Sequence, residues 1–195
     1  MERELIMTGI GGQGIQLAAS VIARAALAEG RYVQVFGSYG GMMRGGNTEA
    51  TIVVADGPVQ APPTISATWS AILMHPAHAA APLHLIRPGG IALFNATVFD
   101  HVPDSIDHGV VGVPATELAL ELGNVVAASM VMVGAYAAAT GLVELSSLED
   151  AAHASLPPYR AAHAELNRRA LQTGFAAAPR LELGAWEASP VATGP

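Results

Sequence analysis

Short apolar segments alternate with longer segments of helical periodicity along the 195 residues of this chain. Each apolar segment has the length of a buried strand and ends at glycine or at other turn-forming residues. In the longer segments, apolar and small residues return every three or four positions, which is typical of helices packed against a sheet. The pattern predicts strands at 4–7, 32–36, 49–54, 69–75, 90–98 and 109–113, and helices at 14–29, 77–85 and 114–123.

The C-terminal third of the chain is predicted to be helical. Residues 125–143 contain no charged side chain and approach the length of a membrane-spanning helix. Glutamates flank this segment where a membrane helix carries basic or aromatic anchors, and Gly141 is a typical helix stop. We therefore expect a buried packing helix, capped by Asn124. Two more helices are expected, one from Ser146 or Ser147 to Ser155 and one over 159–173.

Alternation of strands and helices predicts an α/β fold: a Rossmann-like, mostly parallel sheet with helices on both faces and a helical C-terminal part. Ligand sites in such folds lie beyond the carboxyl ends of the strands. We expect residues 1–175 to form one α/β domain. Residues 176–195, rich in Ala, Pro and Gly, are expected to form an irregular arm. Trp186 either anchors this arm on a neighbouring molecule or lies in a frayed end.

The composition narrows the possible functions. Apolar residues make up 51% of the chain and charged residues 13%, so part of the surface must be apolar and suited to a partner. The net charge is −7 and no lysine is present, which disfavours nucleic-acid binding. Without cysteine the chain can form no disulfide and can ligate no iron–sulfur cluster through thiolates. The N-terminus lacks the pattern of a secretion signal, so we expect a cytoplasmic protein that is not bound to a membrane.

A glycine-rich turn at 9–14 fits the pattern G-x-G-x-x-G and stands between a predicted strand and a predicted helix. Glycine lets the backbone approach an anion, and the first N–H groups of the helix point at it, so a phosphate could bind there. An NAD site would need an acidic residue at the end of the second strand, where this chain has Phe36, Gly37 and Ser38. The alternative is that the glycines only permit a tight turn and close packing.

The loop at 37–46 is the second candidate site, because five glycines surround Arg44 and Tyr39 directly after a strand. Arg44 could bind a carboxylate or a phosphate in a bidentate manner, and Ser38 and Tyr39 offer hydroxyl groups. The alternative is that Arg44 pairs with a carboxylate of the protein and only holds the loop in place.

Histidines and serines give weaker signals. Pro76 separates His75 from His78, and no nearby acidic residue or cysteine completes a metal site. His75 ends the fourth predicted strand, so it either contacts a ligand or an interface, or serves as an ordinary cap. No G-x-S-x-G turn is present, so hydrolase chemistry is unsupported.

Three segments together resemble the γ subunit, or γ domain, of thiamine-diphosphate-dependent 2-oxoacid:ferredoxin or acceptor oxidoreductases, of the 2-oxoglutarate, indolepyruvate, pyruvate or phenylglyoxylate type. The first is GIGGQGIQLAA at 9–19 and the second is SYGGMMRGGNTEAT at 38–51. The third comprises VPATE at 113–117, LGN at 122–124 and MVMVG at 130–134. The resemblance implies an assembly that oxidatively decarboxylates a 2-oxoacid to an acyl-CoA and passes electrons to ferredoxin or NAD.

The resemblance also implies how the work is divided among subunits. The γ subunit would cover the active site and help to bind coenzyme A, with no catalytic residue, metal or redox centre of its own. Thiamine diphosphate with Mg and the [4Fe-4S] clusters would lie on partner subunits of the α, β and δ types, to which a flavin subunit can be added. The coenzyme A site implied on this chain comprises Gly11, Gly12, Gln13, Gly14, Ser38, Tyr39, Arg44, Gly45 and Gly46.

This chain departs from the family pattern just before Arg44. A Pro-Glu pair commonly stands there, whereas this chain has Gly41, Met42 and Met43. Methionines can line an adaptable apolar pocket, which favours an aromatic or branched 2-oxoacid over 2-oxoglutarate. Two other functions remain open at this point, a stand-alone Rossmann-like nucleotide-binding protein and a purely structural subunit.

Overall fold

The computed structural model describes residues 1–39, 46–60, 65–101, 109–156, 162–182 and 184–186. The strands are β1 (Glu2–Ile10), β2 (Tyr32–Tyr39), β3 (Asn47–Ala55), β4 (Thr68–Leu73), β5 (Ile86–Asn95) and β6 (Gly109–Val113). The helices are α1 (Ile15–Ala28), α2 (Ala80–Leu85), α3 (Ala115–Glu121), α4 (Ala128–Thr140), α5 (Leu145–Ala154) and α6 (Ala162–Ala177). Three short 3₁₀ helices are η1 (Pro76–His78), η2 (Ala96–Val98) and η3 (Val125–Ala127).

The six strands form one sheet in the order β2-β3-β1-β4-β5-β6. Pairing is parallel from β1 through β4 and β5 to β6, which confirms the predicted mostly parallel sheet. The exception is β3, which is antiparallel to both β1 and β2. Only seven residues separate β2 from β3, too few for the crossover that a parallel pair needs. Five strands therefore run in one direction, and their carboxyl ends share one edge.

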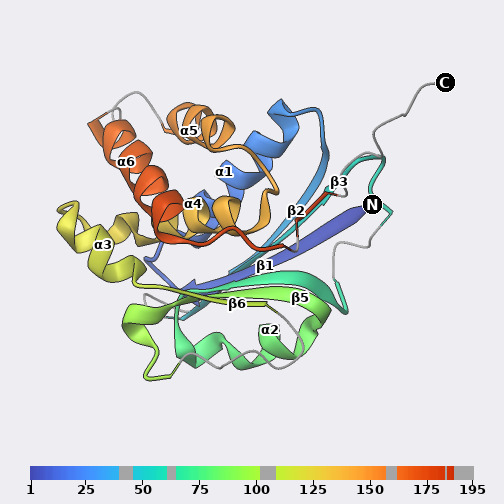
Figure 1. Cartoon of the computed structure of the whole chain (residues 1–195), viewed down its shortest axis with the longest axis horizontal. Coiled ribbons are helices and arrows are strands. Elements are labelled where there is room, and N and C mark those ends of the chain that lie inside the picture. The colour runs from blue at the N-terminus through green and yellow to red at the C-terminus, as the bar shows by residue number, and fades with distance from the viewer. Residues whose placement is uncertain (40–45, 61–64, 102–108, 157–161, 183, 187–195) are drawn as a thin grey trace.

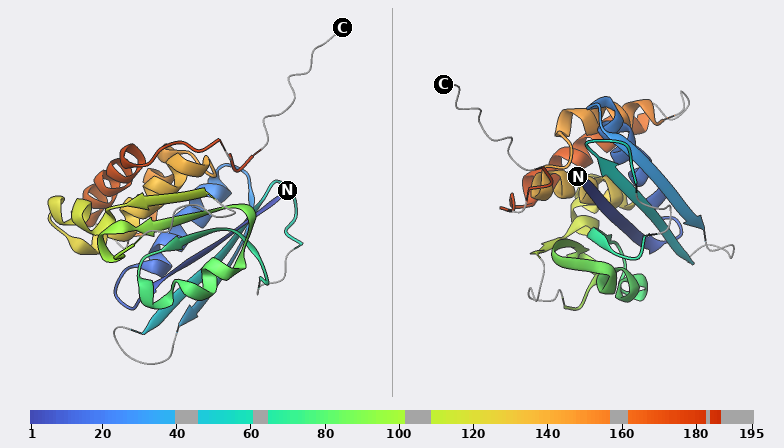
Figure 2. Two further views of the ribbon diagram at one scale, coloured as in Figure 1. Left: turned by 60° about the horizontal axis from the view of Figure 1, so that its bottom comes forward. Right: turned by 90° about the vertical axis from the view of Figure 1, so that its right-hand side faces the viewer.

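Helices cover both faces of the sheet, as predicted, but unevenly. The helices α1, α4, α5 and α6 lie on one side and α2 lies on the other (Figure 1; Figure 2 shows the same layers from two further directions). Apolar side chains of the central strands, such as Leu5 and Ile72, form the large core under α1 and α4. On the opposite face, Leu73 and Phe94 form a smaller core under α2, in which Phe94 meets Phe99 edge to face.

The apolar segment at 125–143 folds as the expected packing helix. Every residue of α4 is buried, which explains why this helix carries no charge. Gly141 ends α4 in the left-handed conformation with φ 62°. Asn124 is the predicted cap, and its side chain accepts the N–H of Val126, although the turn that it begins is η3. None of the helices within the described ranges has both the length and the apolar character needed to cross a membrane.

The crossing of α4 and α6 depends on two glycines. A Cβ atom on Gly134 of α4 would overlap the backbone oxygen of Leu171, and one on Gly174 of α6 would overlap the backbone oxygen of Val131. Each glycine therefore lets the other helix approach backbone to backbone. This contact also corrects the prediction that the last helix ends before Gly174: α6 continues to Ala177 because Gly174 serves packing and not termination.

Several other predicted boundaries were wrong. The first strand continues to Ile10, because β3 pairs with it along its whole length, up to Asn47. Helix α5 begins at Leu145 with Glu144 at its N-cap, so neither Ser146 nor Ser147 is the cap.

The described part of the C-terminal arm is tied to its own chain. The N–H groups of Leu181 and Ala185 donate to the carbonyls of Ala139 and Thr140 at the end of α4, at 3.0 and 2.7 Å. The indole of Trp186 donates to the carbonyl of Leu142 at 3.0 Å and lies 3.8 Å from the guanidinium of Arg31. Trp186 therefore anchors the arm on this molecule, which neither sequence alternative had foreseen.

Candidate functional site

The glycine turn lies where the carboxyl ends of the strands meet. It connects β1 to α1, and two of its residues have positive φ, 104° at Gly12 and 79° at Gly14, a conformation that favours glycine. Gly14 is the N-cap of α1 and supplies no side chain to the first turn. A Cβ atom there would also meet the hydroxyl of Ser129 on α4. The start of α1 is thus left without a side-chain cap, as a backbone anion site requires.

The two glycine-rich loops converge at this edge. The N–H of Gly11 donates to the carbonyl of Gly46 at 2.9 Å, which joins the turn after β1 to the end of the loop before β3. Beside this bond, Ile10 pairs with Asn47 in the sheet. Ser38 and Tyr39 are the last two residues of β2 and reach the same edge. Two members of the predicted site, Arg44 and Gly45, lie outside the described residues.

Gln13 stabilises the glycine turn from within. Its side-chain oxygen accepts the N–H of Ile10 at 2.9 Å, and its side-chain nitrogen donates to the carbonyl of Met74 at 3.4 Å. The turn is thereby held against the end of β4. Because the Gln13 amide is engaged in this way, the groups that the turn can offer to a ligand are mainly backbone N–H groups.

A cavity of about 260 Å³ opens beside the glycine turn and is called the turn cavity here. Its walls come from the carboxyl ends of the strands and from the start of α4, so residues distant in the sequence meet in it. The lining residues are Ile10, Gly12, Gln13, Met74, His75, Val98, Thr116, Val125, Val126 and Ala128. Two of the three sequence segments that carry the family resemblance contribute to this wall.

His75 is the ordinary cap that was one of its two predicted roles, and it also borders the candidate site. Its Nδ1 accepts the N–H of Ala77 at 3.2 Å and so caps η1, and its side chain also lines the turn cavity. Since Nδ1 is an acceptor here, neutral His75 carries its proton on Nε2 and can donate from that atom. In the described ranges, no three His, Asp or Glu side chains lie close enough together to hold a metal ion.

Thr116 and Asn95 form a polar pair that no sequence motif indicated. Asn95 ends β5 and is fully buried; its side-chain nitrogen donates to the Thr116 hydroxyl at 2.8 Å, and its side-chain oxygen accepts the Thr116 N–H at 3.2 Å. This pair fixes the start of α3 against β5 and places Thr116 in the wall of the turn cavity. The only indication of this pair in the sequence was Asn95, the one amide in a mostly apolar predicted strand.

Glu49 is a second residue that was missed. It lies on β3, opposite Thr8 of β1 and Ser38 of β2, close to the site edge. Partial burial raises the pKa of its carboxyl group above the usual value of 4.5. The folded protein therefore holds this proton more tightly than the unfolded chain does, and the free energy of unfolding falls as pH rises from about 4.5 through the raised pKa.

Replacing Glu49 by Gln removes this titration. We expect the variant to gain stability relative to the wild type as pH rises from 4 to 7, because the wild type alone pays the cost of ionising a partly buried carboxyl group. The gain should stay below about 1 kcal/mol, since the group is only partly desolvated. Urea unfolding at both pH values measures the difference, and a constant difference between the two proteins would contradict the raised pKa.

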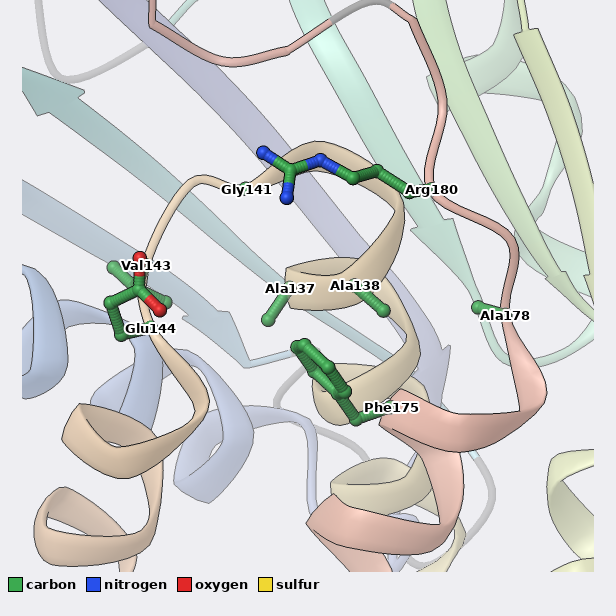
Figure 3. Close-up of a pocket in the computed structure, with 8 residues that line it drawn as sticks. All are labelled: Ala137, Ala138, Gly141, Val143, Glu144, Phe175, Ala178 and Arg180. Atoms are coloured by element: carbon green, nitrogen blue, oxygen red, sulfur yellow. The ribbon is translucent and has the colours of Figure 1, made fainter.

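A different cavity, of about 240 Å³, lies at the far end of α4. Figure 3 shows the Phe175 ring, the Glu144 carboxylate and the Arg180 guanidinium arranged around it. None of the residues that the sequence singled out as a site lines this cavity, and it stands at the edge opposite the glycine turn. Its residues therefore serve as controls for experiments on the turn cavity.

Comparisons with known proteins identify the family of this chain. The family model described as pyruvate ferredoxin/flavodoxin oxidoreductase matches residues 4–177. The 2-oxoglutarate synthase subunit KorC of Methanothermobacter thermautotrophicus is 33% identical over 180 residues, which cover 89% of this chain and 94% of that subunit. The pyruvate/ketoisovalerate oxidoreductases common subunit gamma of Thermococcus kodakarensis is 29% identical, with 88% and 95% covered.

Solved structures show the same fold. The keto/oxoacid ferredoxin oxidoreductase gamma subunit of Geobacter sulfurreducens superposes with a TM-score of 0.78 at 27% identity and covers 91% of this chain and 96% of its own. The 2-oxoglutarate:ferredoxin oxidoreductase of Magnetococcus marinus, solved with 2-oxoglutarate, coenzyme A and succinyl-CoA bound, also gives 0.78, at 19% identity. This chain matches 33% of that longer polypeptide. The chain therefore belongs to the pyruvate ferredoxin/flavodoxin oxidoreductase family, among the γ subunits of the multi-subunit 2-oxoacid:ferredoxin oxidoreductases.

Proposed function

We propose that this γ subunit binds coenzyme A at the turn cavity and covers the active site of an assembly that converts a 2-oxoacid to an acyl-CoA. The observation that carries the proposal is that the glycine turn lines the turn cavity and is joined to the end of the second glycine-rich loop by the bond from Gly11 to Gly46. Electrons would pass to ferredoxin or NAD through other subunits.

The residues of the turn cavity fit coenzyme A in two respects. The N-terminus of α1 carries a partial positive charge and uncapped N–H groups, which suit phosphate oxygens. The apolar wall formed by Ile10, Met74 and Val98 suits the thiol-bearing arm, and Thr116 and His75 offer polar contacts to its amide groups. In this proposal Arg44 supplies a fixed positive charge to an anionic group of the same ligand or of the substrate.

The redox cofactors fit other chains better than this one. With no cysteine, this chain offers no thiolates to a [4Fe-4S] cluster. Thiamine diphosphate with Mg would likewise be held by the α, β or δ subunits, with a flavin subunit where NAD is the acceptor. Leu120, Val125 and Val126 are exposed large apolar residues on α3 and η3, near the site edge. A partner that covers them would also close the turn cavity to bulk water.

Replacing Arg44 by Ala tests the proposal in the purified complex. We expect kcat/KM for coenzyme A to fall by about tenfold or more, because a charge-assisted hydrogen bond contributes about 1.5–3 kcal/mol. Arg44→Lys should recover part of the loss, since it restores the charge without the planar fork. Steady-state kinetics on complexes with equal subunit content, checked by size-exclusion chromatography, measures this.

The matched control for Arg44→Ala is Arg180→Ala, which removes an exposed arginine at the opposite edge of the fold. We expect Arg180→Ala to leave kcat/KM unchanged. If Arg44→Ala also left assembly and turnover unchanged, the chain would be a purely structural subunit and the proposal would fail.

A further inference from the structure

The cavity of about 240 Å³ at the far end of α4 is called the far cavity here. It lies where the end of α4, the start of α5, the end of α6 and the C-terminal arm come together (Figure 3). Nothing in the proposed function uses it, because the turn cavity lies at the opposite end of α4. Its volume is below the ~300 Å³ at which pockets for drug-sized ligands begin, so it suits a smaller molecule.

Two opposite charges line the far cavity without pairing. Glu144 stands at the N-cap of α5 and Arg180 lies in the arm, and Figure 3 shows their charged groups on different sides of the cavity. Among the described residues, neither charged group forms an ion pair or a hydrogen bond, with the other or with a third residue. A small molecule between them could therefore contact both without displacing a partner within the described chain.

The end of α4 adds a hydrogen-bond acceptor to the wall of the far cavity. The carbonyls of Ala137, Ala139 and Thr140 each accept an N–H group from a later residue. The carbonyl of Ala138 accepts none from the described residues, because the N–H of Leu142 donates to the Thr140 hydroxyl instead, at 3.2 Å. Ala138 lines the cavity, and the carboxyl end of a helix is its negative end. This position therefore favours a cationic donor.

Phe175 supplies an apolar wall. Its side chain belongs to the last turns of α6 and is 38% exposed, although large apolar residues in this helix otherwise face the core, such as Leu171. In Figure 3 the Phe175 ring points toward Ala137, and Val143 lines the same cavity. An aliphatic group placed on this ring would lose contact with water and gain dispersion contacts. The far cavity thus combines a cation, an anion and one apolar surface.

We propose that the far cavity binds an α-amino acid with an aliphatic side chain. The carboxylate pairs with the Arg180 guanidinium, the ammonium group contacts the Glu144 carboxylate and the Ala138 carbonyl, and the side chain packs on Phe175. A phosphate or dicarboxylate would be repelled by Glu144 and an organic cation by Arg180, so a zwitterion fits better than either. Coenzyme A kinetics are measured without amino acid, so Arg180→Ala remains a control for the turn cavity.

The test uses L-leucine and two analogues that each lack one charge. Isothermal titration calorimetry on the intact complex measures the binding of leucine, of leucinamide, which has no carboxylate, and of 4-methylpentanoate, which has no amine. We expect leucine to bind about tenfold or more tightly than either analogue. In Arg180→Gln the preference for leucine over leucinamide should disappear, and in Glu144→Gln the preference for leucine over 4-methylpentanoate should disappear. This crossed pattern assigns each charge of the ligand to one side chain.

Arg24→Gln and Glu182→Gln are the matched controls. They make the same chemical changes at exposed residues that do not line the far cavity, and they should bind leucine as the wild type does. Absence of leucine binding to the wild-type complex would overturn the inference. Leucine binding that persists unchanged in Arg180→Gln and Glu144→Gln would overturn it as well, because the amino acid would then occupy another site of the complex.

Discussion

Replacing Gly174 by Ala is expected to destabilise the fold by about 2 kcal/mol. The added methyl group would overlap the backbone of α4 at Val131, and backbone cannot rotate away as a side chain can. Forced overpacking of this kind costs about 3 kcal/mol. The higher helix propensity of alanine returns about 1 kcal/mol, which is too little to change the sign. For a chain of this size the midpoint of thermal unfolding should fall by about 4–8 °C.

Gly57→Ala is the matched control for this prediction. It makes the same chemical change at a position where a Cβ atom meets nothing within 4 Å and where φ is not positive. We expect Gly57→Ala to stay within about 0.5 kcal/mol of the wild type. If Gly174→Ala unfolded together with Gly57→Ala in urea, the close crossing of α4 and α6 would be incorrect.

Replacing Gly12 by Asp is expected to raise the KM for coenzyme A on the order of 100-fold. The new carboxylate would stand in the wall of the turn cavity beside the start of α1, where the proposed function places the phosphates. Like charges at that distance repel, and the positive end of α1 would be partly neutralised before the ligand arrives. Steady-state kinetics of the complex, with the 2-oxoacid saturating, measures this effect.

Gly12→Asn isolates the charge in this experiment. Asn and Asp have nearly the same size and both tolerate positive φ better than most residues, so the strain at φ 104° is common to the two variants. We expect Gly12→Asn to change the KM by about tenfold less than Gly12→Asp does. If Gly12→Asn and Gly12→Asp raised the KM for coenzyme A equally, the shape and not the charge of the new side chain would cause the loss. The result would then contradict a phosphate site at the turn.

Much of the fold could be predicted from the sequence, because its signals are local. The glycine turn before α1, the cap at Asn124 and the charge-free α4 each follow from a few neighbouring residues. The direction of β3 was not predicted, since alternation of strands and helices does not reveal which strands a short loop connects. Gly174 was misinterpreted for a similar reason: a glycine that ends a helix and one that admits a crossing helix look the same in sequence.

The candidate site was predicted in outline only. The resemblance identified both glycine-rich loops, and the structure brings them together at one edge. The sequence could not show that the Gln13 amide is hydrogen-bonded within the turn, or that Asn95 positions Thr116.

The anchored C-terminal arm bears on where further polypeptide could be attached to this fold. Arg3 donates to the carbonyl of Ala185, so the first strand and the last described residues meet at the edge opposite the glycine turn. Residues that precede Glu2 or follow Trp186 therefore begin at the edge away from the glycine turn. The same fold occurs as nearly the whole of one solved chain and as about a third of a longer one.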